Sequence, residues 1–234
     1  MSNGPLLSAY DLRREFDSPS GKLPVLKGVR MDLHAGRLAF IIGRSGSGKS
    51  TLLHLLGGLD RPDGGKILFE GEELTRLGER ALARIRNRRI GFVFQFFHLL
   101  PELTLFENVI LPSFIAGKRD KKWTEEVLKK VGLWDRRDHF PGELSGGEQQ
   151  RGAIARALVN HPALVLCDEP AGNLDQETAE SVFSLIYDLN KREGLSFLIV
   201  THDEALAWRH EQVMRLVDGV LLSEERGKMR AQKV

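Results

Sequence analysis

A glycine-rich stretch near residue 45 has the residue types and spacing of a phosphate-binding loop. Residues 43–50 read Gly-Arg-Ser-Gly-Ser-Gly-Lys-Ser and match the pattern G-x-x-x-x-G-K-[ST] in full. Its glycines let the backbone curl, so that successive N–H groups point at phosphate oxygens. We expect Lys49 to reach the outer phosphates of a nucleotide and the Ser50 hydroxyl to bind Mg²⁺. The expected binding set is Gly43, Arg44, Ser45, Gly46, Ser47, Gly48, Lys49, Ser50 and Thr51.

The residues on either side of this loop support a bound phosphate. Residues 38–42 form a short continuous apolar run, which is typical of a buried parallel strand. Residues 51–56 read as a helix, whose positive N-terminal end would face an anion. The alternative, a glycine-rich turn that binds nothing, does not require this lysine and serine between a strand and a helix.

Two adjacent acids follow a second apolar run at residues 163–167. In a parallel sheet, ligands bind at the carboxyl ends of the strands. We therefore expect Asp168 to hold Mg²⁺ and Glu169 to orient and deprotonate an attacking water. The alternative is a solvated strand end with a helix-capping acid. The phosphate loop elsewhere in the chain favours the functional interpretation.

Two further polar residues end strand-like runs. His202 follows residues 196–201 within Thr-His-Asp and could hydrogen-bond the γ-phosphate. Gln95 follows residues 90–94 and could contact both Mg²⁺ and water. Taken alone, the histidine fits the start of a helix better, and the glutamine fits a polar strand end equally well.

A second anion site is predicted at residues 144–151, Leu-Ser-Gly-Gly-Glu-Gln-Gln-Arg. A serine and two glycines at the start of a helix through residue 158 would present free N–H groups to a phosphate. With this stretch the chain resembles the ABC ATPase family over nearly its whole length. Other phosphate-loop enzymes lack this signature, so the resemblance argues against a small-molecule kinase.

The resemblance implies ATP as substrate and a homodimer of ATPase subunits packed head to tail when ATP is bound. Each ATP would lie between the phosphate loop of one copy and the signature of the other, here Ser145, Gly146, Gly147 and Glu148. Gln95 matches the family's Q-loop glutamine and His202 its switch histidine. Asp175, in residues 171–175, matches the D-loop. Phe16 stands where an aromatic ring stacks on adenine, with Tyr10 as the alternative.

Within this family the chain most resembles the lipoprotein-releasing, macrolide-export and cell-division branch. The similarity lies in residues 54–60, 94–101, 107–109 and 172–175. It implies an integral membrane partner on another chain and lipoprotein release from, or export across, the inner membrane. The alternative is a regulatory ATPase of the cell-division type, which transports no solute. Ala171 and Gly152 depart from the branch, which usually has Thr and Val there.

The resemblance also implies the fold class, an α/β P-loop NTPase with a parallel sheet core. We expect one ABC ATPase domain over residues 1–234. Its nucleotide-binding core would comprise residues 1–95 and 156–234, including an N-terminal antiparallel β subdomain with a turn at 17–21 and a hairpin at 64–73. Residues 96–155 would form the inserted helical subdomain that carries the signature. Residues 96–105 either pack in that subdomain or form a groove for a partner's helix.

Bulk composition agrees with a peripheral protein. The 234 residues include 41% hydrophobic residues and a single cysteine, Cys167, which fits a reducing compartment. No window reaches the roughly 20 apolar residues that span a bilayer, and no signal peptide is evident. We expect membrane association only through the partner, at the cytoplasmic face of the inner membrane. A net charge of +2 and a single phosphate loop argue against a nucleic-acid partner.

Overall fold

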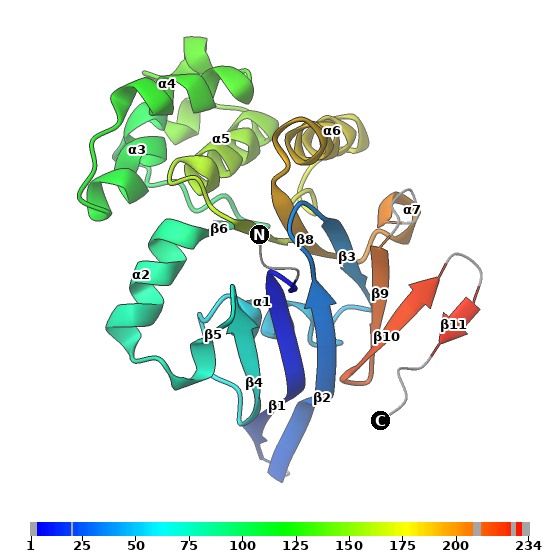
Figure 1. Ribbon diagram of the computed structural model, residues 1–234. Coiled ribbons are helices and arrows are strands. Elements are labelled where there is room, and N and C mark those ends of the chain that lie inside the picture. Colours follow the sequence, from blue (N-terminus) through cyan, green and yellow to red (C-terminus); the bar gives the residue numbers. More distant parts are fainter. Residues whose placement is uncertain (1–3, 20, 208–211, 226–227, 231–234) are drawn as a thin grey trace. The chain divides into compact units, whose positions relative to one another are not determined.

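The computed structural model describes residues 4–19, 21–207, 212–225 and 228–230 (Figure 1). The chain divides into two compact units. The first comprises residues 1–82 and 196–234, and the second comprises residues 83–195. The expected subdivision at residues 96 and 155 stays a prediction.

The first unit contains an antiparallel sheet in the strand order β2-β1-β4-β5. Its strands are β1 (Leu7–Ser18), β2 (Gly21–Leu33), β4 (Gly64–Phe69) and β5 (Glu72–Glu73). The expected hairpin at 64–73 is thus present, but β1 and β2 extend into the stretch expected to be a turn at 17–21. Ser18 pairs with Gly21, so strand pairing covers most of the stretch that we expected to be a wider turn. Figure 1 shows β1 between β2 and β4.

The first unit also contains a parallel group of strands. β3 (Leu38–Ile42) lies between β8 (Ser196–Thr201) and β9 (Gln212–Val217) and runs parallel to both. Residues 39–42 and 197–200 are fully buried, which explains their apolar runs. β10 (Val220–Glu225) and β11 (Lys228–Arg230) continue antiparallel from β9. The helical elements of this unit are α1 (Lys49–Leu56), η1 (Leu74–Arg76) and α7 (Glu204–Ala207).

The helix α2 (Glu79–Arg89) begins in the first unit and continues into the second. The second unit holds the parallel pair β6 (Ile90–Val93) and β7 (Leu164–Asp168), in which Val93 lies opposite Cys167. Its helices are α3 (Leu105–Ile115), α4 (Lys121–Lys130), α5 (Gly146–Leu158) and α6 (Gln176–Glu193), with 3₁₀ turns η2 (Trp134–Arg136) and η3 (Pro141–Glu143). Four side chains cap the N-termini of these helices, namely Thr104, Asp120, Ser145 and Asp175.

Close packing of α5 on α3 explains the glycine at position 152. A Cβ atom there would lie 2.7 Å from Leu105 Cδ1 and 3.6 Å from Leu99 Cδ1. A glycine inside a helix costs about 0.5–1 kcal/mol relative to alanine. Here it lets α5 approach a fully buried leucine, so this departure from the branch pattern has a packing reason.

Across the residues that the structure describes, the helices are too short or too polar to cross a bilayer.

Candidate nucleotide-binding site

The phosphate loop connects β3 to α1 in the first unit, and two of its glycines have left-handed backbone conformations. Gly46 has φ +77° and Gly48 has φ +97°, in the region that L side chains rarely adopt. The loop folds back on itself, since the N–H of Ser47 donates to the Arg44 carbonyl over 3.2 Å. A Cβ at Gly48 would lie 2.8 Å from Val25 Cγ1, so the loop also packs on β2.

Lys49 lies across its own loop. Its side chain is largely buried, with 7% of the residue exposed, and Nζ donates to the Gly43 carbonyl at 2.9 Å and the Arg44 carbonyl at 3.2 Å. The helix that begins here has Gly48 at its N-cap, without a side-chain cap and without an acid in its first turn. An uncapped helix start and a buried ammonium group together favour an anion at this loop.

His202 leaves the same sheet edge as the phosphate loop. Ile42 lies opposite Thr201 in the parallel pairing of β3 with β8, and Gly43 and His202 directly follow them. The turn after β8 is held by two hydrogen bonds: Thr201 Oγ1 accepts from the Asp203 N–H, and Asp203 Oδ1 accepts from the Leu206 N–H, both at 3.0 Å. The imidazole is exposed at this turn.

The two candidate aromatic rings lie at different places on β1. Phe16 is 40% exposed and lies opposite Leu23, two residues from the Val25 that packs on the phosphate loop. Tyr10 is 39% exposed and lies opposite Lys66 of β4, whose Nζ is 5.1 Å from its ring centre. The end of β1 that carries Phe16 is therefore the end beside the loop.

The second unit brings Gln95, Asp168 and Glu169 to one edge of its parallel strands. Because Val93 lies opposite Cys167, the residues that follow these two positions leave the pair at the same side. Glu169 has φ +46°, a costly conformation for a residue with a side chain, and its carbonyl accepts from the Gly172 N–H over 3.0 Å. A tight turn thus follows the two acids.

Asn173, for which the sequence predicted no role, holds Gln95 in place. Gln95 Nε2 donates to Asn173 Oδ1 at 3.0 Å, and Asn173 Nδ2 donates to the Gln95 carbonyl at 3.2 Å. A Cβ at Gly172 would lie 3.0 Å from Gln95 Nε2 and 3.4 Å from Glu169 Cβ. Asn173 lies inside the 172–175 stretch that pointed to the family, but only Asp175, two residues further on, was expected to act.

The signature begins α5 with a reciprocal cap. Ser145 Oγ accepts from the Glu148 N–H at 3.2 Å, while Glu148 Oε2 accepts from the Ser145 N–H at 2.8 Å. Arg136 Nε donates to Glu148 Oε1 at 3.1 Å. The Ser145 N–H, more than any other single group, lowers the pKa of the Glu148 carboxyl below its ordinary value, and Arg136 adds to this.

The signature glycines pack against the D-loop and the start of α6. A Cβ at Gly147 would lie 2.4 Å from Thr178 Cγ2, and one at Gly146 would lie 3.2 Å from Leu174 Cδ2. Asp175 caps α6 by accepting hydrogen bonds from the Thr178 N–H at 3.0 Å and from the Thr178 hydroxyl at 2.6 Å. These bonds lower the pKa of the Asp175 carboxyl. Ser145, Gly147 and Asp175 thus belong to one local cluster.

Two further α5 residues hold the segments around Gln95 and Glu169. Gln150 is fully buried, and its Nε2 donates to the Pro170 carbonyl at 2.6 Å and the Phe94 carbonyl at 3.3 Å. Arg156 donates to the carbonyls of Phe97, at 2.8 Å, and His98. The signature pattern includes Gln150, but nothing in the sequence indicated which carbonyls it would meet.

The expected ligands of Mg²⁺ are Ser50, Gln95 and Asp168. Ser50 lies in the first turn of α1, and Gln95 and Asp168 follow β6 and end β7. All three offer oxygen atoms, the ligands that Mg²⁺ prefers. Over the described part of the chain, His, Cys, Asp and Glu do not gather in groups of three or more that could bind a metal by themselves.

Comparison with known proteins identifies the family. Residues 26–172 match the family described as "ABC transporter". The chain is 49% identical over 204 residues to the lipoprotein-releasing system ATP-binding protein LolD of Bacteroides thetaiotaomicron, covering 86% of this chain and 94% of that protein. The family and the lipoprotein-releasing resemblance inferred from the motifs agree with this relative.

Solved structures give the same result for the fold. The dimeric post-hydrolysis state of the ATP-binding cassette MJ0796 bound to ADP and Pi matches with TM-score 0.84 and 35% identity, over 97% of this chain and 99% of that one. The dimeric structure of MJ0796 described as a bacterial ABC transporter cassette matches equally well. The expected P-loop NTPase fold is therefore confirmed, and the chain belongs to the ABC transporter family as one of its ATP-binding, ATP-hydrolysing cassettes.

Proposed function

We propose that this chain is the ATPase subunit of a lipoprotein-releasing transporter and drives a separate membrane protein from the cytoplasmic face of the inner membrane. The observation that carries the proposal is the 49% identity to a LolD protein over 94% of its length. An alignment of that extent includes the phosphate loop, the paired acids and the signature. The similarity to LolD therefore covers the residues proposed to bind and hydrolyse ATP.

In this proposal the first unit binds the nucleotide. The loop N–H groups and the start of α1 bind the phosphates, and Lys49 exchanges its bonds to the Gly43 and Arg44 carbonyls for phosphate oxygens. His202 donates a hydrogen bond to the γ-phosphate, which its position at the same sheet edge as Gly43 supports. Phe16 stacks on adenine, since a phenyl ring offers the π-face that stacking needs.

The second unit supplies the groups that act on water. Glu169 accepts a proton from the attacking water, which then forms a bond to the γ-phosphorus as the bond to the leaving ADP breaks. Gln95 positions that water, held by its bonds to Asn173. Bound Mg²⁺ would be held by Ser50, Gln95 and Asp168 and would neutralise phosphate charge.

We further propose that two copies enclose two ATP molecules. The chain carries two surfaces suited to phosphate, the phosphate loop and the signature with Ser145, Gly146, Gly147 and Glu148. A two-fold dimer would pair each loop with the signature of the other copy. The dimeric form of the two MJ0796 structures supports this arrangement. Asp175 would then lie at the dimer interface.

The surface for the membrane partner is proposed to lie in the segment after Gln95. Phe96 is 66% exposed and Leu100 is 43% exposed, so this segment presents two large apolar side chains to solvent. Arg156 fixes the backbone between them through the carbonyls of Phe97 and His98. An apolar helix of the partner could therefore dock on a rigid segment that also carries Gln95.

The test is copurification from native membranes. A tagged Glu169→Gln protein, incubated with ATP and Mg²⁺, should retain a membrane protein with few spans and a large extracytoplasmic domain, identified by mass spectrometry. A tagged Lys49→Ala protein is the matched control and should retain less of it. Recovery of a cell-division protein instead would favour the regulatory alternative. Dimerisation with ATP but no membrane partner would contradict the transport proposal while leaving the ATPase intact.

A further inference from the structure

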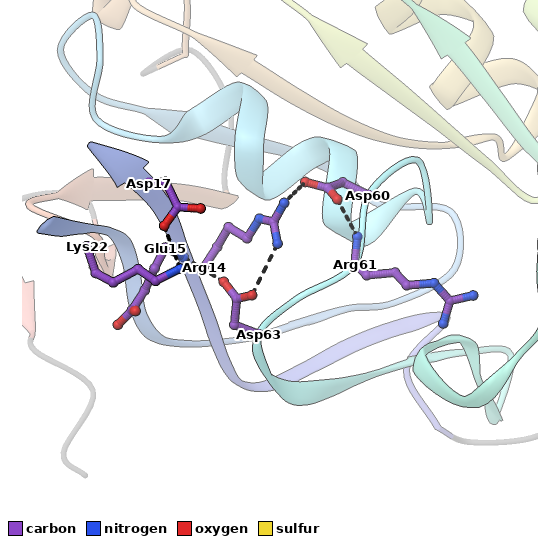
Figure 2. A network of polar contacts seen from close by, with 7 residues as sticks. All are labelled: Arg14, Glu15, Asp17, Lys22, Asp60, Arg61 and Asp63. Atoms are coloured by element: carbon purple, nitrogen blue, oxygen red, sulfur yellow. Dashed lines mark hydrogen bonds and ion pairs between the residues drawn. The ribbon is translucent and has the colours of Figure 1, made fainter. Parts of the chain in front are cut away.

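The side chain of Arg14 links its own strand, β1, to the loop that follows α1 (Figure 2). Its Nη2 atom lies 2.8 Å from Asp60 Oδ2, and its Nη1 atom lies 3.2 Å from Asp63 Oδ1. The arginine side chain is only 21% exposed, whereas those of Asp60 and Asp63 are 39% and 48% exposed. The two carboxylates therefore fix the plane of a largely buried guanidinium group.

Hydrogen bonds between Asp63 and the backbone of β1 also hold this loop against the strand. Asp63 Oδ2 accepts from the Glu15 N–H at 2.7 Å, and the Asp63 N–H donates to the Arg13 carbonyl at 2.9 Å. Asp60 Oδ1 also accepts from the Arg61 N–H at 2.7 Å. The segment at the end of the helix that starts with Lys49 is thus tied to the strand that carries Phe16.

The guanidinium group also faces the Phe16 ring. Arg14 Cζ lies 4.9 Å from the ring centre, within the range of a cation–π contact. Arg14 and Phe16 lie two residues apart on β1, whose pairing with β2 shifts register between Arg14 and Glu15. Phe16 remains 40% exposed, so the arginine covers part of the ring while part stays open.

We propose that Arg14 is a positioning residue for the nucleotide base. It holds the Phe16 ring from one side, so that the other side is ordered before adenine stacks on it. Asp60 and Asp63 orient Arg14 and connect the base-stacking ring to the helix of the phosphate loop. This inference rests on the proposed function, in which ATP binds at that loop and Phe16 stacks on the base.

A purely structural ion pair would affect the binding of ligands in a different way. If Arg14 only fastens the loop after α1 to β1, its loss would disturb the phosphate loop and weaken every ligand of that loop. If it positions Phe16, its loss would weaken only ligands that have a base. Tripolyphosphate carries the phosphates of ATP without ribose or adenine and separates the two cases.

The experiment measures the Kd values of ATP and tripolyphosphate for four proteins by calorimetry. These are the wild type, Arg14→Met, Phe16→Ala and the control Arg13→Met. Arg13 is the neighbouring arginine, and its side chain is 63% exposed and paired with Asp11. We expect Arg14→Met to raise the Kd of ATP about 3- to 10-fold, the effect of one cation–π contact on a stacked ring, with the Kd of tripolyphosphate unchanged. Arg13→Met should change neither.

Arg14→Lys keeps the result decisive if Arg14→Met folds poorly, and a double variant tests whether Arg14 and Phe16 act together. Arg14→Lys retains a cation for Asp60 and Asp63 but lacks the flat guanidinium face, and should show a smaller loss of ATP affinity, again with the Kd of tripolyphosphate unchanged. The double variant Arg14→Met with Phe16→Ala should bind ATP no more weakly than Phe16→Ala alone, because the two residues act together.

Three outcomes would overturn the inference. These are an unchanged ATP affinity in both Arg14 variants, an equal loss for ATP and tripolyphosphate, and an unchanged ATP affinity in Phe16→Ala. A wild-type protein that bound neither ligand would instead show that the proposed nucleotide site is wrong, and the role of Arg14 would fall with it.

Discussion

The side-chain amide of Gln150 donates a 2.6 Å hydrogen bond to the carbonyl of Pro170, the residue directly after Glu169. The same amide reaches the Phe94 carbonyl, directly before Gln95. One buried glutamine of the signature helix therefore holds the backbone beside both residues that we propose to act on the attacking water. The position of these two residues depends on α5 as well as on the strands before them.

We expect Gln150→Leu to lower the free energy of unfolding by about 1–3 kcal/mol, because the buried Pro170 carbonyl and the part-buried Phe94 carbonyl lose their donor. Denaturant unfolding followed by circular dichroism measures the change. Gln149→Leu is the matched control, since that side chain is half-buried and donates to the Leu144 carbonyl. If Gln149→Leu lowered the free energy of unfolding more than Gln150→Leu, the contacts of Gln150 would not be the ones that stabilise the fold.

Replacing Glu169 by glutamine should slow ATP hydrolysis about 10²- to 10⁴-fold, the usual contribution of a general base. ATP binding should persist, because the amide has nearly the same shape, and a stable ATP-bound dimer should accumulate. Phosphate release and size-exclusion chromatography report the two effects. Glu126→Gln, on the exposed side of α4, should hydrolyse ATP normally. Hydrolysis at the native rate by Glu169→Gln would exclude this residue as the base.

Lys49→Ala should weaken ATP binding about 10- to 150-fold, the loss of a hydrogen bond between charged groups. Equilibrium binding of a fluorescent ATP analogue measures this directly. The exposed Lys118 serves as a control, and Lys118→Ala should bind like the wild type. An unchanged affinity in Lys49→Ala would mean that its bonds to the loop carbonyls, not to phosphate, are its main role.

Ser145→Arg should prevent ATP-dependent dimerisation while each monomer still binds ATP. A long cation at the start of α5 would occupy the place proposed for the other copy's nucleotide. Sedimentation of the variant in the Glu169→Gln background tests this. Ser145→Thr keeps a capping hydroxyl and should still dimerise. Loss of ATP binding by the Ser145→Arg monomer would instead place the signature at the nucleotide of its own chain.

The lowered pKa of the Glu148 carboxyl predicts that the stability of the fold depends on pH. The Ser145 N–H and then Arg136 lower its pKa below the ordinary value of 4.5. A carboxyl whose pKa is lower in the folded state stabilises the fold above its unfolded pKa and loses this effect as pH falls through the folded pKa. Wild type should therefore exceed Glu148→Gln in unfolding free energy at pH 7, and the difference should shrink as the pH falls below 4.5. A difference independent of pH would contradict this.

The sequence predicts well what is local. The strand, loop and helix at residues 38–56 follow from one apolar run, the glycines and the lysine, and the structure has them at β3 and α1. The order of strand, acids and helix around Glu169 is equally readable. The fold class and the family were confirmed by the relatives, whereas the roles of the individual site residues remain predictions.

Contacts between distant residues could not be predicted in this way. Gln95 and Asn173 are 78 positions apart, and nothing in either motif specifies their reciprocal hydrogen bonds. The extent of β1 was also missed, because its pairing with β2 contains irregularities that break the alternation of buried and exposed residues. The reason for Gly152 became apparent only from the Leu105 side chain packed against it.

The close contact between Gly147 and Thr178 has a consequence for how this chain can diverge. A side chain at position 147 would meet Thr178 of α6, and in the proposed dimer it would also obstruct the approach of a phosphate. At position 169, by contrast, the change to glutamine is expected to stop hydrolysis while keeping nearly the same side-chain shape. A descendant cassette that had lost hydrolysis through drift should therefore change at Glu169 long before it changes at Gly147, so an intact glycine pair is no proof of a working ATPase.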